Sequence, residues 1–448
     1  MPRDLALTVL NSLDYSPGFQ ERYLETVFEE NPGLDERDRA FIVHLVQGVL
    51  RWRIRLDWII TQTVRFPFDN IEPPILNILR LALYQIFFMD RVPEHAAVNE
   101  AVRQARRAGN KHVPGFVNGI LRHVCRGKGR IFSPDPSMER DLYLSVSYAY
   151  PLWLIKKWTK ELGPEAAERL LDSGNRIPET VIRVNTLKID RKGLIQRLTD
   201  EGVNGVAPSY SPEGVNLYGF KGSVSRLKTF QEGLFQVQGE AAQVCSHLLV
   251  PRSGELVFDV CAGLGGKSTH LAALMNDRGL VLALDRSRAR LKGLLQNSVR
   301  LGTGSVLPVV ADASGQLSWV LRYFFDKILV DGPCSGLGVI SRHPDTKLTK
   351  TEEDIERLAL LQKTILNQAV QLLRKNGRIL YVTCTISREE NEDVVEDFLE
   401  KNDDMALEDL KRSIPEWGSD LIDDNGFYRT FPHVHGIEGF FGALFRKN

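Results

Sequence analysis

Two cysteines in the chain follow apolar runs, and their positions favour a chemical role over packing. Cys334 lies in Asp331-Gly-Pro-Cys-Ser-Gly336, and Cys384 lies in Tyr381-Val-Thr-Cys-Thr385. Both apolar runs are typical of buried parallel strands, whose carboxyl ends meet at one edge of a sheet. A lone cysteine is most often a small buried hydrophobe. Two thiols at one predicted edge make that interpretation much weaker.

The segment Asp259-Val-Cys-Ala-Gly-Leu-Gly-Gly-Lys-Ser268 predicts a ligand-binding loop between a strand and a helix. A phosphate loop needs a glycine where Cys261 stands, and a dinucleotide loop needs one where Ser268 stands. The segment therefore matches neither pattern in full. Cys261 itself is interpreted as a packing residue whose backbone meets the ligand.

Three aspartates at the ends of further predicted strands decide between these ligands. Asp285 follows the glycines by about twenty residues, where a carboxylate can bind both hydroxyls of a ribose. Asp312 is suited to the edge of an adenine, and Asp331 ends the next strand. So many carboxylates would repel a triphosphate unless magnesium intervened. S-adenosylmethionine carries an adenosine, an ammonium and a sulfonium without phosphate, and it is favoured over a nucleoside triphosphate.

A methyl donor beside two thiols suits methylation of cytosine at C5. This carbon is too electron-poor to attack a sulfonium methyl directly, but a thiolate that adds to C6 makes C5 nucleophilic. A second ionisable group then assists loss of the C5 proton and release of the thiolate. Ser387-Arg-Glu-Glu390 predicts a capping box that opens a helix to about Leu399. A thiol just ahead of that helix, Cys384, should have a lowered pKa, and the glycine-rich turn at Cys334 leaves room for a flat base.

Hydrophobic patterning predicts three regions in the 448 residues. Residues 1–130 have helical spacing throughout and predict an all-α domain, residues 140–238 a small α+β module, and residues 239–448 a doubly wound α/β domain. Apolar runs predict strands at 255–261, 279–285, 305–312, 327–331, 378–384 and 439–445.

Composition excludes several other classes. No apolar segment reaches about 18 residues and no signal peptide is evident, so we expect a cytoplasmic protein. The five cysteines include no Cys-x-x-Cys pair, which argues against a disulfide scaffold and structural zinc. Cys125 and Cys245 lie inside amphipathic helices and are expected to be packing residues.

A local basic tract predicts contact with nucleic acid, although the whole chain has 57 acidic and 57 basic residues. Solvated helix faces would explain it equally well. Residues 101–130 contain no Asp or Glu, and their basic residues are Arg103, Arg106, Arg107, Lys111, Arg122, Arg126, Lys128 and Arg130.

Several blocks together resemble the RNA (cytosine-5) methyltransferases of the Fmu/Sun type. The matching blocks lie at 259–267, 331–336, 342–345, 382–386, 431–436 and 439–441. The helical N-terminal region is similar to the NusB RNA-binding fold, through the blocks at 38–41, 48–51, 78–85, 95–101 and 115–122. The combination covers nearly the whole chain and looks like the architecture of bacterial 16S ribosomal RNA methyltransferases.

The resemblance implies a role for each site residue. It implies that Cys384 is the nucleophile and Cys334 assists product release, whereas the DNA enzymes use the Pro-Cys thiol as nucleophile. We further hypothesise that Asp331 reaches N3 of the cytosine. The cofactor-binding positions that it implies are Cys261, Ala262, Gly263, Leu264, Gly265, Gly266, Lys267, Asp285, Asp312 and Asp331.

Two departures from the family pattern are expected to affect the affinity for the cofactor more than the type of reaction. Leu264 stands where the family usually has proline, and Gly239 stands where it commonly has aspartate. The expected partner is 16S RNA before or during small-subunit assembly, with a monomeric protein, no metal and no membrane. The alternatives are a methyltransferase for another RNA such as tRNA, or a non-catalytic RNA-binding assembly or antitermination factor.

Overall fold

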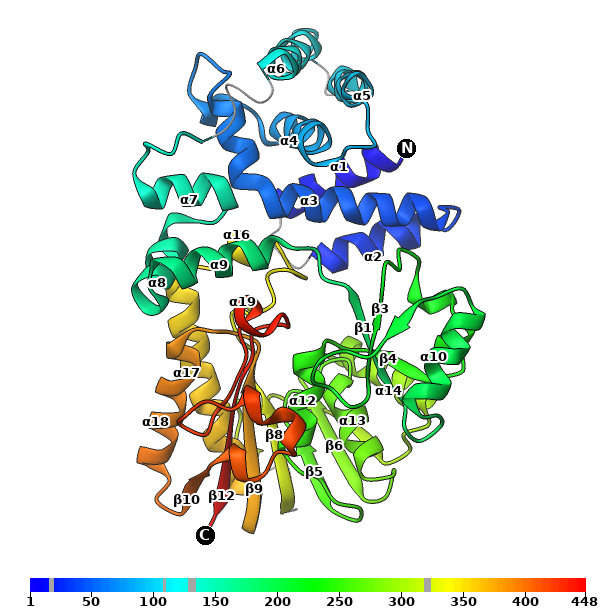
Figure 1. Cartoon of the computed structure of the whole chain (residues 1–448), viewed down its shortest axis with the longest axis vertical. Coiled ribbons are helices and arrows are strands. Elements are labelled where there is room, and N and C mark those ends of the chain that lie inside the picture. The colour runs from blue at the N-terminus through cyan, green and yellow to red at the C-terminus, as the bar shows by residue number, and fades with distance from the viewer. Residues whose placement is uncertain (16–19, 108–109, 128–133, 318–323) are drawn as a thin grey trace. The chain divides into compact units, whose positions relative to one another are not determined.

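The computed structural model describes residues 1–15, 20–107, 110–127, 134–317 and 324–448 (Figure 1). The chain forms two compact units, the first made of residues 1–176 and 340–349 and the second of residues 177–339 and 350–448. Within the described residues, no helix is long and apolar enough to cross a membrane.

The first unit is helical, as the hydrophobic spacing of residues 1–130 predicts. It also includes residues 140–175, which were expected in the α+β module, and residues 340–349, which were expected in the α/β domain. Its helices are α1 (Pro2–Tyr15), α2 (Gln20–Glu30), α3 (Glu36–Thr61), α4 (Pro73–Phe88), α5 (Glu94–Arg107), α6 (Val113–Gly127), α7 (Arg140–Tyr148), α8 (Leu152–Leu162), α9 (Pro164–Asn175) and α16 (Thr346–Thr349), with the short 3-10 turn η1 (Phe68–Asn70).

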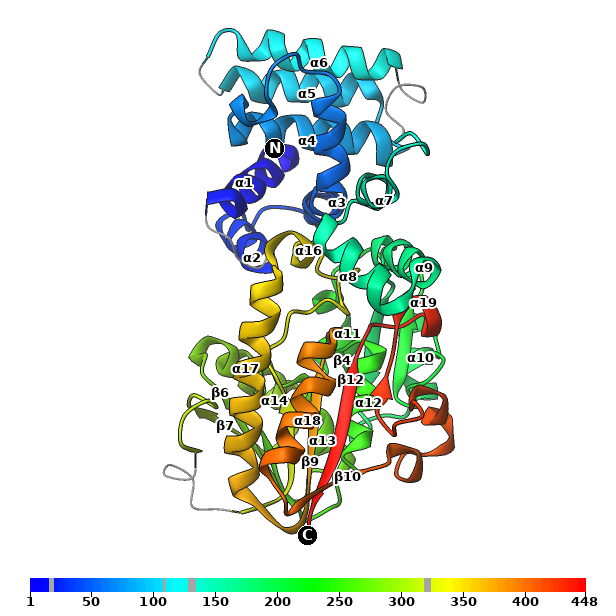
Figure 2. The same ribbon diagram turned by 90° about the vertical axis from the view of Figure 1, so that its left-hand side faces the viewer.

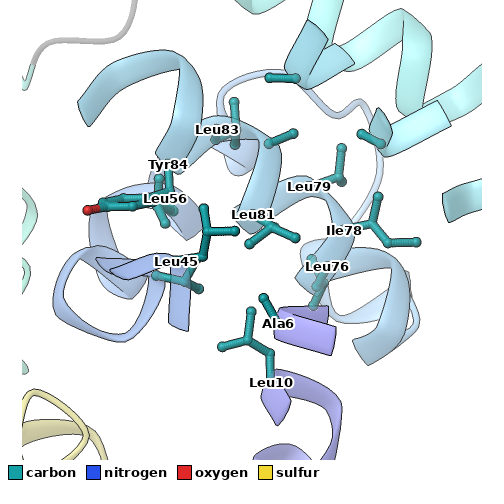
Figure 3. Packing of buried hydrophobic residues seen from close by; sticks show 14 of the residues in the cluster. Ala6, Leu10, Leu45, Leu56, Leu76, Ile78, Leu79, Leu81, Leu83 and Tyr84 are labelled. Carbon is teal, nitrogen blue, oxygen red and sulfur yellow. The ribbon is translucent and has the colours of Figure 1, made fainter. Parts of the chain in front are cut away.

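Helix α4 is the centre of this unit because nearly its whole surface is apolar. It begins at two prolines, which suit the first turn of a helix since their missing N–H groups have no partner there. Figure 3 shows Leu79 and Leu81 of α4 among side chains of α1 and α3, including Leu10 and Leu45. Helix α3 starts at Asp35, whose carboxylate accepts the Asp38 N–H at 2.8 Å.

The second unit begins with a small antiparallel sheet, as expected for an α+β module. Its strands lie in the order β2-β3-β1-β4, and Ile182 of β1 pairs with Val215 of β3 on one side and Val237 of β4 on the other. The elements are β1 (Thr180–Val184), α10 (Arg191–Asp200), β2 (Gly205–Val206), β3 (Gly214–Leu217), η2 (Val224–Arg226), α11 (Lys228–Gln231) and β4 (Phe235–Val237).

The rest of the second unit is a doubly wound domain around a larger sheet. Its helices are α12 (Glu240–Leu248), α13 (Gly266–Leu274), α14 (Arg288–Leu301), α17 (Glu352–Ala369), α18 (Glu392–Lys401) and α19 (Pro432–His435). Its strands are β5 (Leu256–Asp259), β6 (Leu280–Asp285), β7 (Val306–Val310), β8 (Phe325–Asp331), β9 (Leu373–Thr383), β10 (Met405–Glu408), β11 (Tyr428–Arg429) and β12 (Phe441–Lys447). The 3-10 turns are η3 (Val370–Leu372), η4 (Arg388–Glu390), η5 (Leu410–Arg412) and η6 (Glu416–Leu421).

The strand order explains why the candidate site residues lie at one edge of the sheet. The order is β10-β12-β9-β8-β5-β6-β7, and the strands from β9 to β7 are parallel. Their carboxyl ends therefore meet at one edge, where ligands of such sheets bind. The last strand, β12, is antiparallel to β9, so the C-terminal strand differs from the parallel ones that the apolar pattern suggested.

Apolar residues cover both faces of this sheet. One cluster joins the strands to α17 and α18, which lie side by side along one face (Figures 1 and 2). The other cluster joins them to α12, α13 and α14. Burial on both faces explains the nearly continuous apolar runs that made these strands recognisable.

Candidate active site

The loop after β5 is held in shape by two glycines and one aspartate. Gly263 and Gly265 have φ of 57° and 80°, values that glycine adopts without strain. The Gly263 N–H donates to the Asp285 carboxylate at 3.0 Å, so the loop is fixed to the end of β6. Leu264 is 58% exposed at the tip. The departure from proline at this position therefore affects an exposed tip and leaves both glycine turns in place.

Asp285 ends β6, as predicted, and Asp312 lies two residues after the end of the neighbouring strand β7. Asp285 is buried and also accepts the Ser287 N–H at 2.7 Å. Asp312 is exposed and accepts the N–H and hydroxyl of Ser314 at 2.9 and 2.6 Å, which lowers the pKa of its carboxyl. The edge thus offers carboxylate groups to a ligand with hydroxyls and positive charge. This chemistry fits an adenosine with an ammonium and a sulfonium.

Lys267 and Asp331 form an ion pair across the edge, with Nζ 2.6 Å from a carboxylate oxygen. Burial alone would lower the pKa of Lys267, but the charge and hydrogen bond of Asp331, with the neighbouring thiols, raise it above its usual value. The ammonium also lies 5.3 Å from the centre of the Phe440 ring. A permanent cation therefore stands beside the aspartate of the Pro-Cys block.

The two thiols predicted to act together are in direct contact. Sγ of Cys334 lies 3.2 Å from Sγ of Cys384, although the residues come from loops after different strands. The hydrogen bond with Cys384, followed by burial, raises the pKa of the Cys334 thiol well above its usual value. Cys334 therefore holds its proton more tightly than an ordinary thiol.

A buried glutamate fixes these two loops. Glu390 accepts the Ser335 N–H and hydroxyl at 2.8 and 2.5 Å, and its burial raises the pKa of its carboxyl. The Ser335 and Thr385 hydroxyls lie 2.8 Å apart, and the Gly338 N–H donates to the Cys384 carbonyl at 3.0 Å. The loop that carries each thiol is therefore tied to the other.

The predicted capping box at Ser387 is wrong. Ser387 precedes the short turn η4 and makes no side-chain capping hydrogen bond, and α18 begins only at Glu392. Glu390, which the capping box needed, points instead to Ser335. Cys384 therefore does not lie directly ahead of an α-helix, and the predicted helix N-terminus beside its thiol is wrong.

Sequence reasoning missed Asp259 and Glu390 as parts of the site. Asp259 is buried below the loop and accepts the Ser268 hydroxyl at 2.6 Å. Burial raises the pKa of its carboxyl to about 7. A polar residue that ends an otherwise apolar strand was the available signal for Asp259, whereas nothing in the local pattern connects Glu390 with Ser335.

The remaining cysteines have the packing roles expected of them. Cys245 is fully buried and donates to the Ala241 carbonyl, and Cys125 packs against the core of the first unit. Cys261 packs beneath the glycine loop after β5, where burial and then the surrounding carboxylates raise the pKa of its thiol well above its usual value. The raised pKa values of the Cys245 and Cys261 thiols make these two residues poor nucleophiles.

Gly239 has a steric reason to be glycine. A Cβ atom built at this position would overlap the carboxylate of Glu438. The neighbouring Glu240 accepts the N–H groups of Tyr210 and Ser211. An aspartate at position 239 would therefore have to displace the Glu438 carboxylate, which lies against this glycine.

The basic tract of the first unit divides into paired and exposed side chains. Arg103 is bound by Asp4 and Glu100, and Arg107 also contacts Asp4. The acid comes from α1, far away in the sequence. Arg106, Lys111, Arg122 and Arg126 are exposed. Lys128 and Arg130 lie outside the described residues.

The fold and the site together define a class. A parallel sheet with an antiparallel last strand, a glycine loop after β5 and acidic residues at the next strand ends is the architecture of a Rossmann-like S-adenosylmethionine-dependent methyltransferase.

Comparison with known proteins places the chain within this class. Family models match at residues 1–126 (NusB family), 150–222 (RsmF/B-like methyltransferase, ferredoxin-like domain) and 246–446 (16S rRNA methyltransferase RsmB/F). A probable ribosomal RNA small subunit methyltransferase B of Bacillus subtilis is 34% identical over 446 residues, which are 99% of this chain and 98% of that protein. The ribosomal RNA small subunit methyltransferase B of Proteus mirabilis is 32% identical over 87% of this chain and 89% of its own length.

Solved structures agree with this placement. The crystal structure of PH0851 has a TM-score of 0.81 at 27% identity and covers 100% of this chain and 99% of that one. NSun6 from Pyrococcus horikoshii, solved with SFG, has a TM-score of 0.60 at 28% identity over 67% of this chain and 99% of its own. The chain belongs to the RsmB/F family of 16S rRNA methyltransferases.

Proposed function

We propose that the protein transfers a methyl group from S-adenosylmethionine to C5 of a cytosine in 16S ribosomal RNA through a covalent adduct with Cys384. The observation that carries the proposal is the 3.2 Å contact between the Cys334 and Cys384 sulfurs at the carboxyl edge of the sheet. A single thiol would be enough for packing or for a simple nucleophile. Two thiols in contact, beside the ion pair of Lys267 and Asp331, suit a reaction that must both form and break a bond to sulfur.

The cofactor would lie along the ends of β5, β6 and β7. Asp285 would accept the ribose hydroxyls and Asp312 would contact the adenine, while residues 261–267 would approach the ligand through their backbone. S-adenosylmethionine supplies the methyl group when bound. The exposed Asp312 and the open space around Gly263 support this placement.

The two thiols would act in sequence on the flipped-out base. Cys384 loses its thiol proton to solvent, and its thiolate forms the bond from Sγ to C6. N3 takes up a proton from solvent, which makes C6 electrophilic, and the Asp331 carboxylate stabilises this proton by accepting a hydrogen bond from N3–H. Lys267 holds Asp331 in position at 2.6 Å. Once C5 carries the methyl group, a water molecule takes the C5 proton, the C5–C6 double bond re-forms and the bond from C6 to Sγ breaks. Cys334 assists this release by donating its thiol proton to the departing Cys384 thiolate, 3.2 Å away, and N3 gives its proton back to solvent.

The first unit would hold the RNA. Its exposed basic side chains at 106, 111, 122 and 126 can neutralise phosphates without reading sequence. The names of the related proteins give ribosomal RNA as the substrate. We therefore propose 16S RNA, before or during small-subunit assembly, as the substrate and the cytoplasm as the site of action.

A methyl-transfer assay tests the proposal. Purified protein is incubated with S-adenosylmethionine labelled in the methyl group and with naked 16S RNA or tRNA, and the labelled base is identified after nuclease digestion. We expect label in 5-methylcytosine of 16S RNA. Cys384→Ala should abolish transfer, whereas Cys125→Ala, a cysteine of α6, should transfer like the wild type.

Each alternative predicts a different result. Label on tRNA alone would assign another RNA substrate. No label on naked 16S RNA, an assembly intermediate or tRNA would favour a non-catalytic RNA-binding protein. Transfer by Cys384→Ala would contradict the assigned nucleophile.

A further inference from the structure

A cluster of metal-ligand side chains, which the proposed methyl transfer does not use, lies in the second unit. Glu213 precedes β3, His247 lies in the last turn of α12, and His270 lies in α13. One ligand atom from each lies within 4.8 Å of the other two. The Glu213 carboxylate is 2.8 Å from Nε2 of His247 and 3.9 Å from Nε2 of His270.

His270 is the unusual member of the cluster. Its side chain is 2% exposed, and within the described part of the chain neither ring nitrogen has a hydrogen-bond partner. Buried polar groups in folded proteins almost always have such a partner, and each exception requires an explanation. The ring lies edge-on to His247, with centroids 5.2 Å apart, and it can direct a nitrogen towards Glu213.

Arg183 is a cation close to this imidazole. Its guanidinium is fixed by Gln238, the Gly266 carbonyl and the Thr269 hydroxyl. An imidazole binds metals through an unprotonated ring nitrogen.

We propose that Glu213, His247 and His270 bind one zinc ion. Two imidazoles and one carboxylate are ligands that zinc accepts, with a water molecule at the fourth position. Zinc–ligand bonds of about 2.0–2.1 Å place tetrahedral ligand atoms roughly 3.4 Å apart. The separations of the Glu213 carboxylate from Nε2 of His247 and of His270, 2.8 and 3.9 Å, bracket this value, and all three ligand atoms lie within 4.8 Å of one another.

The ion would have a structural role, because its ligands join three elements. Glu213 directly precedes β3 of the small antiparallel sheet, whereas α12 and α13 cover one face of the larger sheet. Helix α13 starts at Gly266 and Lys267, the last residues of the cofactor loop. The zinc would therefore fix the small sheet against the helix that carries this loop. Trp417 lies edge-on to His247, with ring centroids 5.2 Å apart, and shields it.

This site departs from the expectation that the protein holds no metal. That expectation rested on the absence of a Cys-x-x-Cys pair, but the proposed ligands include no cysteine and come from three separate segments. No spacing rule within one segment could find them.

Zinc binding by untagged full-length protein tests the inference. The measurements use the Cys334→Ser/Cys384→Ser background, since the adjacent thiols could bind zinc themselves. Metal content is measured after purification, and zinc is titrated against a chromophoric chelator. We expect one equivalent of zinc and a higher melting temperature with zinc. Cobalt in its place should give the visible absorption of a tetrahedral site.

Two variants and one control make the result specific. Glu213→Gln keeps a hydrogen-bond acceptor for His247 and should preserve the fold, while His270→Ala removes the buried ligand. Each should weaken zinc binding at least tenfold, and His95→Ala, which removes an exposed imidazole of α5, should not. Wild-type affinity in Glu213→Gln, or no zinc bound by the unmodified cluster, would overturn the inference. Metal content is measured without RNA or S-adenosylmethionine, so failure of the methyl-transfer proposal would be seen separately.

Discussion

At the scale of single residues, the site depends on charges held in unusual surroundings. Asp259 is the clearest example, because its buried carboxyl has a pKa raised to about 7 while it supports the cofactor loop through Ser268. In the unfolded chain the same carboxyl has a pKa near 3.8. The folded protein therefore binds an extra proton between these two pH values.

This difference predicts a pH dependence of stability. Between about pH 4 and pH 7 the folded state holds more protons at Asp259 than the unfolded state, so its contribution falls as the pH rises and levels off above pH 7. The size is on the order of a few kcal/mol. Asp259→Asn, which still accepts from Ser268, should remove this part of the slope. Urea unfolding of both proteins at pH 5 and pH 7.5 measures it, and equal slopes would contradict the assignment.

At the scale of elements, helix packing in the first unit depends on one close approach. Gly48 of α3 lies against the Tyr84 ring of α4, and a Cβ atom at this position would overlap the ring. The two helices therefore approach more closely than any larger residue allows.

Substitution of this glycine tests the packing. Gly48→Ala should lower the free energy of unfolding by about 1–3 kcal/mol, because the buried ring must shift. Gly119→Ala in α6 is the matched control, since nothing lies within 4 Å of its added carbon. It should be neutral or stabilising by up to about 1 kcal/mol. Thermal unfolding followed by circular dichroism compares them, and equal effects would show that α3 and α4 are not so closely packed.

Elements with strong periodicity could be predicted from sequence, and irregular ones could not. The helices of the first unit and the parallel strands follow from apolar spacing, because burial on one or both faces leaves a direct pattern. The error at Ser387 arose because a Ser-x-x-Glu spacing looks the same whether the glutamate caps a helix or binds another loop. The antiparallel direction of β12 depends on pairing with β9, which the strand itself does not encode.

At the scale of the whole molecule, the sequence could predict which residues belong to the site, but it could not predict which of them contact one another. Strand-end positions indicated that Cys334, Cys384, Asp285 and Asp331 belong to one edge. Their supporting contacts, such as Glu390 with Ser335, join segments far apart in the sequence. The sequence could not show that Arg103 is paired for the same reason, because its acid partner Asp4 comes from α1, far away in the chain.

The exposed basic side chains predict that the affinity for RNA falls as the salt concentration rises. Arg122→Glu together with Arg126→Glu should weaken binding of 16S RNA by at least tenfold at moderate salt and reduce the dependence of affinity on salt concentration, since each phosphate contact releases counterions. Arg103→Gln is the comparison, because its guanidinium is already paired with Asp4 and Glu100. Filter binding over a series of salt concentrations measures both variants. An unchanged salt dependence in the double variant would place the RNA elsewhere.

The central claim is that Cys384 attacks the base and Cys334 releases it, and trapping of the covalent intermediate tests it most directly. Cys334→Ala is incubated with S-adenosylmethionine and end-labelled 16S RNA, denatured, and analysed for RNA that migrates with the protein. We predict a stable protein–RNA adduct in Cys334→Ala that disappears in Cys334→Ala/Cys384→Ala. An adduct that accumulates in Cys384→Ala instead would contradict the claim and reverse the two roles.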